Sequence, residues 1–388
     1  MLKLPVYCDY NATTPCDPAV MEAMLPYFTE RFGNAASKTH SFGWMAEEAV
    51  DLAREQVAAL VGAGPTEIIF TSGATESDNL AIKGVYEMYA GKGNHIITCI
   101  TEHKAVLDSC RHLEKMGADI TWLPVNSDGL IDTALLEAAI KPTTILIALM
   151  YANNETGVVQ PVKEISAIAR KHGVLFFSDA TQAVGKIPVD VKKDGIDLMA
   201  FSAHKIYGPK GVGALYVSRK NPRVRLTAQL DGGGHERGMR SGTLNVPGIV
   251  AMGKACEICS RQMDAERSRL AALRDKLQAA LLLIPSLQVN GHQQNRLPNV
   301  TNISFAGLDG EGLMLGLNKN IALSSGSACT SASMEPSHVL KAMGLGDDLA
   351  YASLRFSIGR FTTEEQIDFI ISQVSLAVER LRPLQITI

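Results

Sequence analysis

Between residues 66 and 217 the chain alternates short apolar runs with helical patterns. Near-continuous apolar runs predict strands that are buried on both faces, and parallel strands covered by helices have this property. The alternation therefore predicts an α/β fold with a mostly parallel central sheet. The predicted strands span residues 67–70, 95–100, 120–125, 144–150, 174–177 and 196–201.

A long helical pattern follows Asn245-Val-Pro247 and continues to Pro285, which is far longer than a typical globular helix, so we expect it to connect two domains. After it, an αβ pattern resumes, with strands predicted at 300–305, 321–323 and 354–358. Asp309 is expected to open a helix. A last helix is expected to begin at Thr362-Thr-Glu-Glu365, which has the spacing of a capping box.

Composition narrows the range of functions. The 388 residues exceed one ordinary domain, which indicates a large domain and a smaller one. The formal charge of -3 argues against nucleic-acid binding, and no apolar run reaches the length of a membrane span. The N-terminus lacks a signal sequence and the seven cysteines are an odd number, so we expect free thiols and a cytoplasmic protein with a small ligand.

Two short motifs resemble binding sites but have ordinary explanations. Residues 248–255 nearly match a phosphate loop, yet Ala255 replaces the hydroxyl residue that would hold Mg²⁺, and the segment lies within the long helix. Cys256 and Cys259 have the spacing of half a zinc site without a second pair. We interpret them as buried structural cysteines and predict no dedicated metal site.

Lys205 follows the predicted strand 196–201, and Asp179 ends the strand before it. Both lie at the carboxyl edge of the sheet, where open α/β sheets bind ligands. A lysine there is a candidate for Schiff-base formation. Pyridoxal phosphate requires such a lysine and a carboxylate that keeps the pyridine nitrogen protonated. The alternatives are a solvated loop lysine and an aspartate that caps the next segment.

Three further strand ends carry polar groups at the same predicted edge. The sequence Thr71-Ser-Gly-Ala-Thr-Glu-Ser-Asp78 opens a helix with a glycine turn, which favours phosphate binding by free backbone N–H groups. His103 and Asn154 also lie just beyond strands. This convergence, more than any single motif, indicates a ligand site.

The run Ser324-Ser-Gly-Ser-Ala-Cys329-Thr-Ser-Ala-Ser333 places one thiol among small residues. Such a segment has little to pack, so Cys329 is the cysteine best placed to meet a substrate. Arg355 lies in an apolar strand, where an arginine usually needs a carboxylate partner, either from a substrate or from a structural acid.

The chain closely resembles the pyridoxal-phosphate-dependent cysteine desulfurases of the class V aminotransferase superfamily, and in particular the housekeeping and nitrogen-fixation subgroup. The resemblance covers essentially the whole chain. It rests on residues 7–15, 32–34, 71–79, 101–106, 202–211, 235–243, 324–331 and 355–357.

The resemblance implies a fold-type-I enzyme with a large cofactor-binding domain at 16–262. The small domain would comprise 1–15 and 263–388 and carry a mobile cysteine loop at about 324–336. Lys205 would bind the cofactor covalently, Asp179 would contact the pyridine nitrogen, and His103 would stack on the ring and assist proton transfer. Asn154 and Gln182 would contact the ring oxygen and its surroundings.

The resemblance also implies the remaining contacts. Residues implied to bind the phosphate are Ala74, Thr75, Ser202 and His204, with Thr243 from the other subunit of a homodimer. Asn34 and Arg355 would hold the substrate carboxylate; Ala35 stands where the family usually has proline. Cys329 would take sulfur from L-cysteine as a persulfide, leaving L-alanine.

The implied sulfur acceptor is a protein such as an iron–sulfur scaffold. Two rival functions remain, a selenocysteine lyase, which shares the lysine and the aspartate, and a non-catalytic scaffold or regulator on the same fold. The small-residue segment around Cys329 favours cysteine as the substrate, since selenide can leave without a thiol nucleophile. The joint presence of Lys205, Asp179, His103 and Cys329 disfavours a non-catalytic protein.

Overall fold

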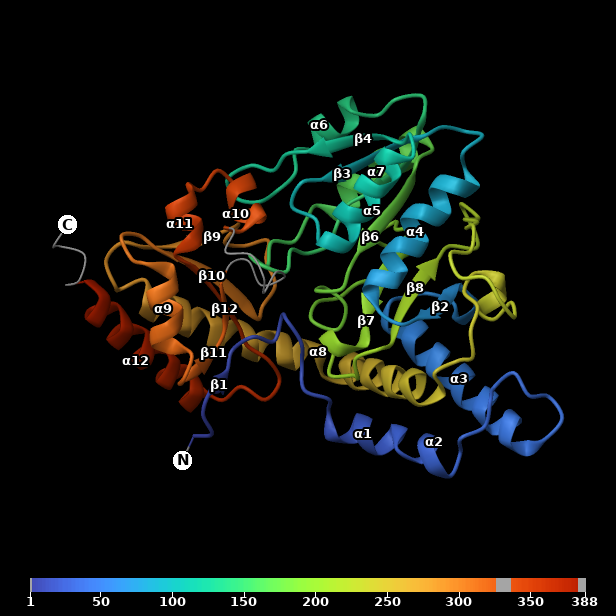
Figure 1. The fold of residues 1–388 in the computed structure, drawn as a ribbon, viewed down its shortest axis with the longest axis horizontal. Helices are drawn as coiled ribbons and strands as arrows, with labels where there is room; N and C mark the ends of the chain where they lie inside the picture. The colour runs from blue at the N-terminus through green and yellow to red at the C-terminus, as the bar shows by residue number, and fades with distance from the viewer. Residues whose placement is uncertain (1, 326–335, 383–388) are drawn as a thin grey trace.

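The computed structural model describes residues 2–325 and 336–382 (Figure 1). Its largest element is a seven-stranded sheet with the order β2-β8-β7-β6-β5-β3-β4. The adjacent strands β4, β3, β5, β6 and β7 run parallel to one another. In this sheet only β8 is antiparallel to its neighbours, β7 and β2. The prediction of a mostly parallel sheet is confirmed. The strands are β2 (Ile68–Thr71), β3 (His95–Cys99), β4 (Asp119–Leu123), β5 (Thr144–Ala148), β6 (Leu175–Asp179), β7 (Leu198–Ser202) and β8 (Gly213–Val217).

Apolar side chains on both faces hold this sheet between layers of helices. Within β6, Phe176 belongs to one buried cluster and Phe177 to another, as expected for side chains that alternate across a strand. The first cluster is covered by α1 (Pro18–Met24), α3 (Ser41–Leu60), α6 (Thr133–Ala138), α7 (Val162–His172) and α8 (Val246–Leu281). The second is covered by α4 (Ala74–Met88) and α5 (Lys104–Lys115).

A second sheet with the order β12-β13-β10-β9 is antiparallel throughout and lies at the other end of the molecule (Figure 1). With β1, β11, α9 and α12 it encloses a third buried cluster. These elements are β1 (Val6–Tyr7), β9 (Leu287–Asn290), β10 (Val300–Phe305), β11 (Ile321–Ala322), β12 (Ser324–Ser325), β13 (Ser353–Ser357), α9 (Gly310–Leu317) and α12 (Glu364–Leu381). Three short helices complete the described chain, α2 (Pro26–Thr29), α10 (His338–Ala342) and α11 (Asp347–Tyr351).

The predicted long helix is α8, which has 36 residues and contributes to two buried clusters. Cys256 belongs to the cluster of the large sheet, whereas Leu277 belongs to that of the small sheet. Most residues between 260 and 269 are exposed, so the middle of the helix bridges the two cores. The proposed boundary between 262 and 263 falls inside this helix and stays a prediction.

The start of the last helix differs from the expected one by one residue. Thr363, and not Thr362, is the N-cap, and its hydroxyl accepts from the N–H of Gln366 at 3.3 Å while the Gln366 side chain returns to the N–H of Thr363. Thr362 is buried and accepts from the N–H of Gly359 instead. Because Thr-Thr-Glu-Glu-Gln fits a capping box in two registers, the burial of the first threonine decided between them.

Across the described ranges, no helix combines the length and the apolar character that crossing a membrane would require.

Candidate active site

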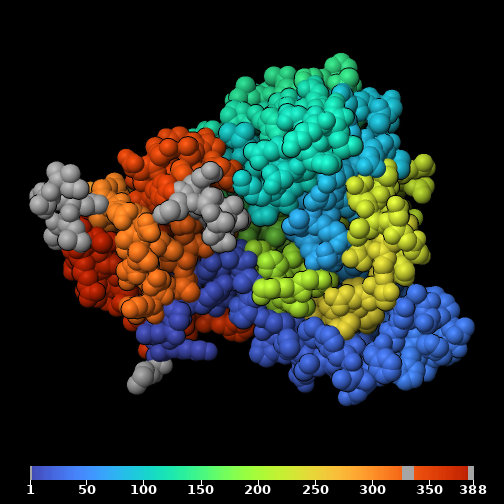
Figure 2. Space-filling view, in the orientation of Figure 1, coloured from blue at the N-terminus to red at the C-terminus, as the bar shows by residue number. Residues whose placement is uncertain are grey.

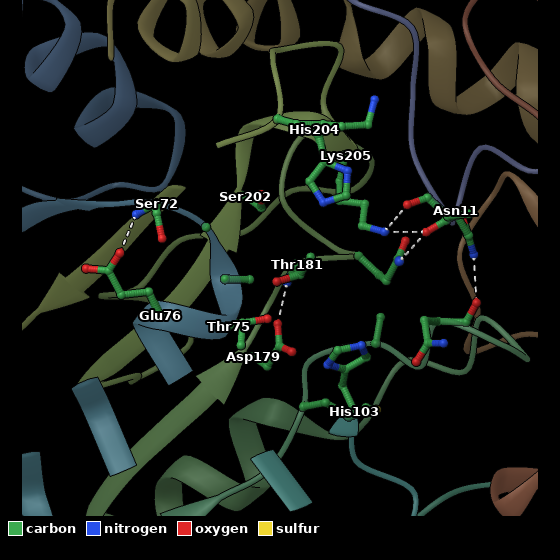
Figure 3. A pocket seen from close by; sticks show the side chains of 18 of the residues that line it. Asn11, Ser72, Thr75, Glu76, His103, Asp179, Thr181, Ser202, His204 and Lys205 are labelled. Carbon is green, nitrogen blue, oxygen red and sulfur yellow. Dashed lines mark hydrogen bonds between the residues drawn. The ribbon is translucent and has the colours of Figure 1, made fainter. Parts of the chain in front are cut away.

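A cavity of about 510 Å³ opens at the carboxyl edge of the large sheet, between this sheet and the β10–β13 region (Figure 3). Figure 2 shows the surface in the same orientation as the ribbon. Ten of the predicted site residues line the cavity: Ala74, Thr75, His103, Asn154, Asp179, Gln182, Ser202, His204, Lys205 and Arg355. The strand ends therefore converge as the sequence predicted.

Lys205 ends a 3-10 turn, Ala203–Lys205, that directly follows β7. Its ammonium donates to the carbonyl oxygens of Asn11 and Ala12, at 2.6 Å each. The side chain is partly buried, whereas a solvated loop lysine, the alternative raised from the sequence, would be exposed. Two carbonyl dipoles thus hold this amine at the wall of the cavity.

Asp179 is the last residue of β6 and is buried. Its Oδ1 accepts from the N–H of Thr181 at 2.9 Å, so the aspartate does cap the local turn. Among the described residues no hydrogen bond reaches Oδ2, and this oxygen remains for the cavity. The capping alternative and a ligand role are therefore compatible.

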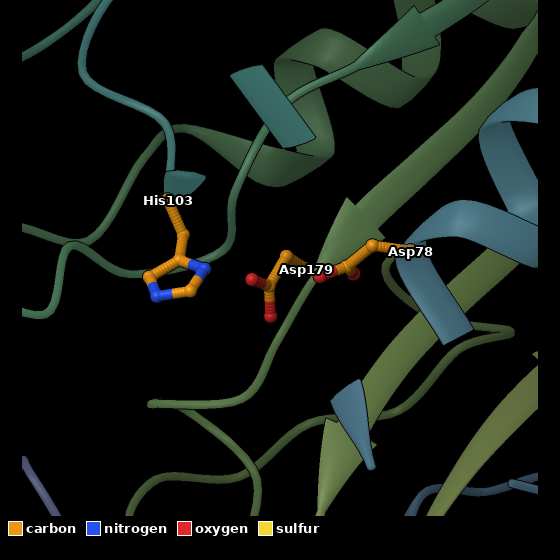
Figure 4. Close-up of side chains that lie close together, drawn as sticks. All are labelled: Asp78, His103 and Asp179. Atoms are coloured by element: carbon orange, nitrogen blue, oxygen red, sulfur yellow. The ribbon is translucent and has the colours of Figure 1, made fainter. Parts of the chain in front are cut away.

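His103 and Asp78 lie beside Asp179, with one potential ligand atom of each within 4.8 Å of the others (Figure 4). Asp78 is fully buried on α4, and neither of its carboxyl oxygens has a hydrogen-bond partner in the described chain. Burial raises the pKa of Asp78 well above its usual value, and the nearby Asp179 and Glu102 add to this rise. Asp78 therefore holds its proton to a higher pH than an ordinary aspartate does.

His103 is the N-cap of α5, and its Nδ1 accepts from the N–H of Ala105 at 3.2 Å. The neutral ring consequently carries its proton on Nε2. Burial lowers the pKa of His103; the Asp179 carboxylate opposes this change and Lys205 reinforces it. A neutral imidazole at the cavity wall can accept or donate a proton near neutral pH.

The turn before α4 offers backbone donors to an anion. Gly73 is the N-cap of this 15-residue helix, with no side-chain cap, and its φ of 157° is one that other residues rarely adopt. Ser202, at the end of β7, lies beside this turn, and His204 follows in the next turn of the chain (Figure 3). Burial, with Lys205 and Lys210, lowers the pKa of His204 to about 4, so its ring is neutral. The helix N-terminus and these donors suit a phosphate group.

Arg355 extends from β13 into the cavity lining, although the residue is only 1% exposed. It donates to Asp9 Oδ1 at 2.7 Å and to the Asn154 carbonyl at 3.0 Å, while its Nε has no partner in the described part of the chain. The sequence left two kinds of partner open for Arg355, a substrate carboxylate and a structural acid. Asp9 is such a structural acid. The guanidinium also faces the cavity, so a second carboxylate can approach it.

Of the other predicted site residues that the structure describes, Asn34 and Thr243 do not line this cavity. Asn34 is exposed, and its Oδ1 accepts from the N–H of Ala36 at 2.9 Å. Thr243 is exposed on the segment before α8. Cys329 lies outside the described residues. Cys256 and Cys259 are free, buried thiols on α8, which agrees with their interpretation as structural residues.

Three residues that shape the site were not singled out from the sequence: Asn11, Asp9 and Asp78. Asn11 and Asp9 precede the first long helix, where no strand or glycine turn marks them as ligands. Asp78 lies in a helix, and only the helical spacing of the apolar residues around it indicates that its side chain is buried. The sequence indicated Asn11 and Asp9 only through residues 7–15, one of the segments on which the family resemblance rests.

The donor set fits pyridoxal phosphate. The helix N-terminus and the Ser202 hydroxyl match a phosphate, the Lys205 amine matches a reactive carbonyl, and the buried Asp179 carboxyl matches a protonated ring nitrogen. The cavity volume lies within the range of small-molecule sites.

The family model described as Aminotransferase class-V matches residues 6–370. A cysteine desulfurase IscS of Anaeromyxobacter dehalogenans (strain 2CP-C) is 58% identical over 384 residues, which cover 99% of this chain and 95% of that protein. A cysteine desulfurase IscS of Pectobacterium carotovorum subsp. carotovorum (strain PC1) is 57% identical over 385 residues, with the same coverage.

Solved structures agree. A NifS-like protein superposes with a TM-score of 0.90 at 37% identity, covering 97% of this chain and 100% of its own. A NifS-like protein from Rickettsia africae gives a TM-score of 0.86 at 30% identity, with coverages of 96% and 99%. Since both the family model and relatives of more than half identity extend over nearly the whole sequence, the chain belongs to the cysteine desulfurases of the aminotransferase class-V family, which are pyridoxal-phosphate-dependent enzymes.

Proposed function

We propose that the cavity around Lys205 converts L-cysteine to L-alanine and passes the sulfur to Cys329 as a persulfide. The observation that carries this proposal is the meeting of Lys205, Asp179 and the α4 N-terminus at one cavity. The similarity to cysteine desulfurases favours cysteine over the selenocysteine and non-catalytic alternatives.

When bound, pyridoxal phosphate supplies an electron-withdrawing ring that stabilises negative charge on the substrate carbon. Asp179 would hold the protonated ring nitrogen, with its Oδ1 already engaged by the N–H of Thr181. Lys205 supplies the amine that binds the cofactor and later moves a proton at Nζ, and the Asn11 and Ala12 carbonyls hold this amine whenever it is an ammonium. His103 would hold a proton at Nε2 at the cavity wall.

Arg355 would orient the substrate through its carboxylate. Its guanidinium is fixed by Asp9 and by the Asn154 carbonyl, so little side-chain entropy is lost when a carboxylate binds. Asn34 is proposed as the second carboxylate ligand on the basis of the resemblance alone, because its side chain is exposed.

The proposed role of Cys329 is supported by the described residues on both sides of its segment. Ser324 pairs with Arg355 across β12 and β13, and its hydroxyl donates to Asp9 Oδ2 at 2.8 Å. On the other side, the Ser337 hydroxyl donates to Glu155. Both flanks are thus attached to residues next to the cavity.

The deciding experiment locates the cofactor and the products. Borohydride reduction of the loaded wild type should fix the cofactor to the peptide that contains Lys205, and L-cysteine with a reductant should give sulfide and alanine in equal amounts. Lys205→Ala should lose both properties. Lys210→Ala, which also removes a cation from the cavity lining, should keep the covalent label. A label on another lysine would refute the assignment.

The proposed enzyme is a homodimer. Exposed apolar side chains cluster on α1, α2 and α3 and the turns between them: Leu25, Phe28, Phe32, Trp44 and Leu52 are 53 to 64% exposed. An apolar surface of this kind is typical of an interface, and we propose that a second copy covers it. The Thr243 segment is exposed, and in the dimer we propose that Thr243 reaches the phosphate of the partner.

Sedimentation tests the dimer. Phe28→Glu should shift the protein toward monomer and lower its activity in parallel. Leu283→Glu changes a leucine that is 84% exposed beyond the end of α8 and should leave the dimer intact. A wild type that is monomeric and fully active would contradict the proposal.

The proposed acceptor is an iron–sulfur scaffold protein in the cytoplasm. The similarity to the IscS cysteine desulfurases supports this acceptor, and the free thiols of the described cysteines suit a reducing compartment. Enzyme labelled with ³⁵S-cysteine should pass its label to a purified scaffold protein, and retention of all label on the enzyme would oppose this acceptor.

A further inference from the structure

Lys186 is a lysine next to the cavity that has no part in the reaction outlined above. It follows Gln182 by four residues in the segment after β6. Its ammonium donates to two side-chain oxygens of cavity-lining amides, Gln182 Oε1 at 2.6 Å and Asn11 Oδ1 at 3.2 Å. In the described ranges these neutral amides, and no carboxylate, are its hydrogen-bond partners.

This ammonium helps to orient both amides, and at Asn11 it does so together with Asn299, whose Nδ2 donates to the same Oδ1 at 3.0 Å. An ammonium can only donate, so it selects the oxygen of each amide and directs the NH₂ group elsewhere. Accordingly, Gln182 Nε2 donates to the Asn11 carbonyl at 2.9 Å, and Asn11 Nδ2 donates to the Asn154 carbonyl at 3.1 Å. The same Asn11 carbonyl accepts from Lys205, so the network reaches the reactive amine.

We propose that Lys186 is a positioning residue that presents an N–H donor of Gln182, and not its oxygen, to the ring oxygen of pyridoxal phosphate. One hydrogen of Nε2 goes to the Asn11 carbonyl, which leaves the other for the cavity that Gln182 lines. The ionised ring oxygen is stabilised by such a donor and repelled by an amide oxygen. The inference rests on the proposed cofactor site.

A role in stability alone explains Lys186 poorly. Burial lowers the pKa of Lys186 well below its usual value, and the neighbouring Lys205 and Arg355 add to this effect. The lysine is therefore costly to the folded state, and a methionine of similar length should be tolerated or should stabilise the fold. A loss of cofactor binding without a loss of stability would then identify the positioning role.

The experiment titrates apoenzyme with pyridoxal phosphate and records affinity, absorption spectrum and thermal stability. Lys186→Met should bind the cofactor about 10-fold more weakly, the equivalent of one charge-assisted hydrogen bond, with an unchanged or higher Tm. Its visible absorption band should lose intensity to the near-ultraviolet band, because the ionised ring oxygen is less favoured. Lys254→Met, which removes a partly buried lysine paired with Glu257 on α8, should bind like the wild type.

Two further variants separate the mechanisms. In a Gln182→Ala background, Lys186→Met should change neither affinity nor spectrum, because no amide remains to be oriented. Lys186→Gln keeps an N–H donor without charge and should lie closer to the wild type than Lys186→Met. Equal effects in both backgrounds, or unaltered binding by Lys186→Met, would overturn the proposal. Failure of the proposed function itself would look different, since the wild type would then show no covalent visible band.

Discussion

The replacement Asp78→Asn should stabilise the protein, and by an amount that grows with pH. Asp78 is buried with both carboxyl oxygens unpartnered, next to Asp179 and Glu102, and its pKa is raised well above the usual value of 3.8. In the folded chain it keeps its proton to a higher pH than in the unfolded chain. The native state therefore binds more protons than the unfolded state, and its stability falls as pH rises.

The magnitude follows from this proton difference. One proton changes the free energy of unfolding by about 1.4 kcal/mol per pH unit, from the usual aspartate pKa up to the raised one. Asparagine has nearly the same shape and never ionises, so the variant lacks this slope. In the window from pH 4.5 up to the raised pKa, its advantage over the wild type should grow by about 1.4 kcal/mol per pH unit. Any constant cost of burying the amide leaves this slope unchanged.

Denaturant unfolding of both cofactor-saturated proteins, at several pH values in this window, measures the slope. Asp264→Asn is the matched control, because its side chain is 84% exposed and burial adds no penalty to its charge. Its difference from the wild type should vary little with pH. A flat difference for Asp78→Asn as well would mean that the pKa of Asp78 is not raised in the folded protein, which would refute this reasoning.

Three other substitutions test separate features. Cys329→Ser should bind L-cysteine and change the cofactor spectrum but form no persulfide. Mass spectrometry of the wild type after one turnover should find added sulfur on the peptide that contains Cys329, and added sulfur found only on other cysteines would exclude Cys329. Glu236→Gln should lower the free energy of unfolding by about 3–5 kcal/mol, because it breaks a buried 2.7 Å pair with Arg54; a loss below 1 kcal/mol in denaturant unfolding would contradict this. Thr363→Ala should cost about 1 kcal/mol through the lost helix cap, and no change in Tm would place the helix start elsewhere.

The sequence predicted the sheet well because its strands are buried on both faces. Each residue of β5, β6 and β7 is buried, so the apolar runs coincide with these strands to within about two residues. The predicted strand 174–177 begins one residue before β6 and ends two residues before it does, since Ser178 and Asp179 are polar yet still pair with β7. The same geometry explains why Lys205 and Asp179 meet, because parallel strands end at one edge.

The sequence predicted less of the site where contacts join distant segments. Asn11 reaches Lys205 across 194 residues through a backbone carbonyl, which no side-chain pattern encodes. Arg355 was expected to need an acid, but its partner Asp9 lies 346 residues away. The positions of Asn34 and Thr243 in a dimer and of Cys329 in its segment remain predictions.

The N-terminal strand imposes an order on the biosynthesis of this enzyme. Val6 pairs with Ile321, and the N–H of Asn11 donates to the Ser357 hydroxyl across 346 residues. A ribosome releases the N-terminal segment first, so the pairing of Val6 and the bond to Ser357 form only after β11 and β13 have left the exit tunnel. Before then the Asn11 carbonyl can be held only by contacts with earlier segments, such as the bond from Gln182 Nε2. A chain that has not reached β13 therefore lacks part of the support of its lysine amine, although all strands of the large sheet have already been synthesised.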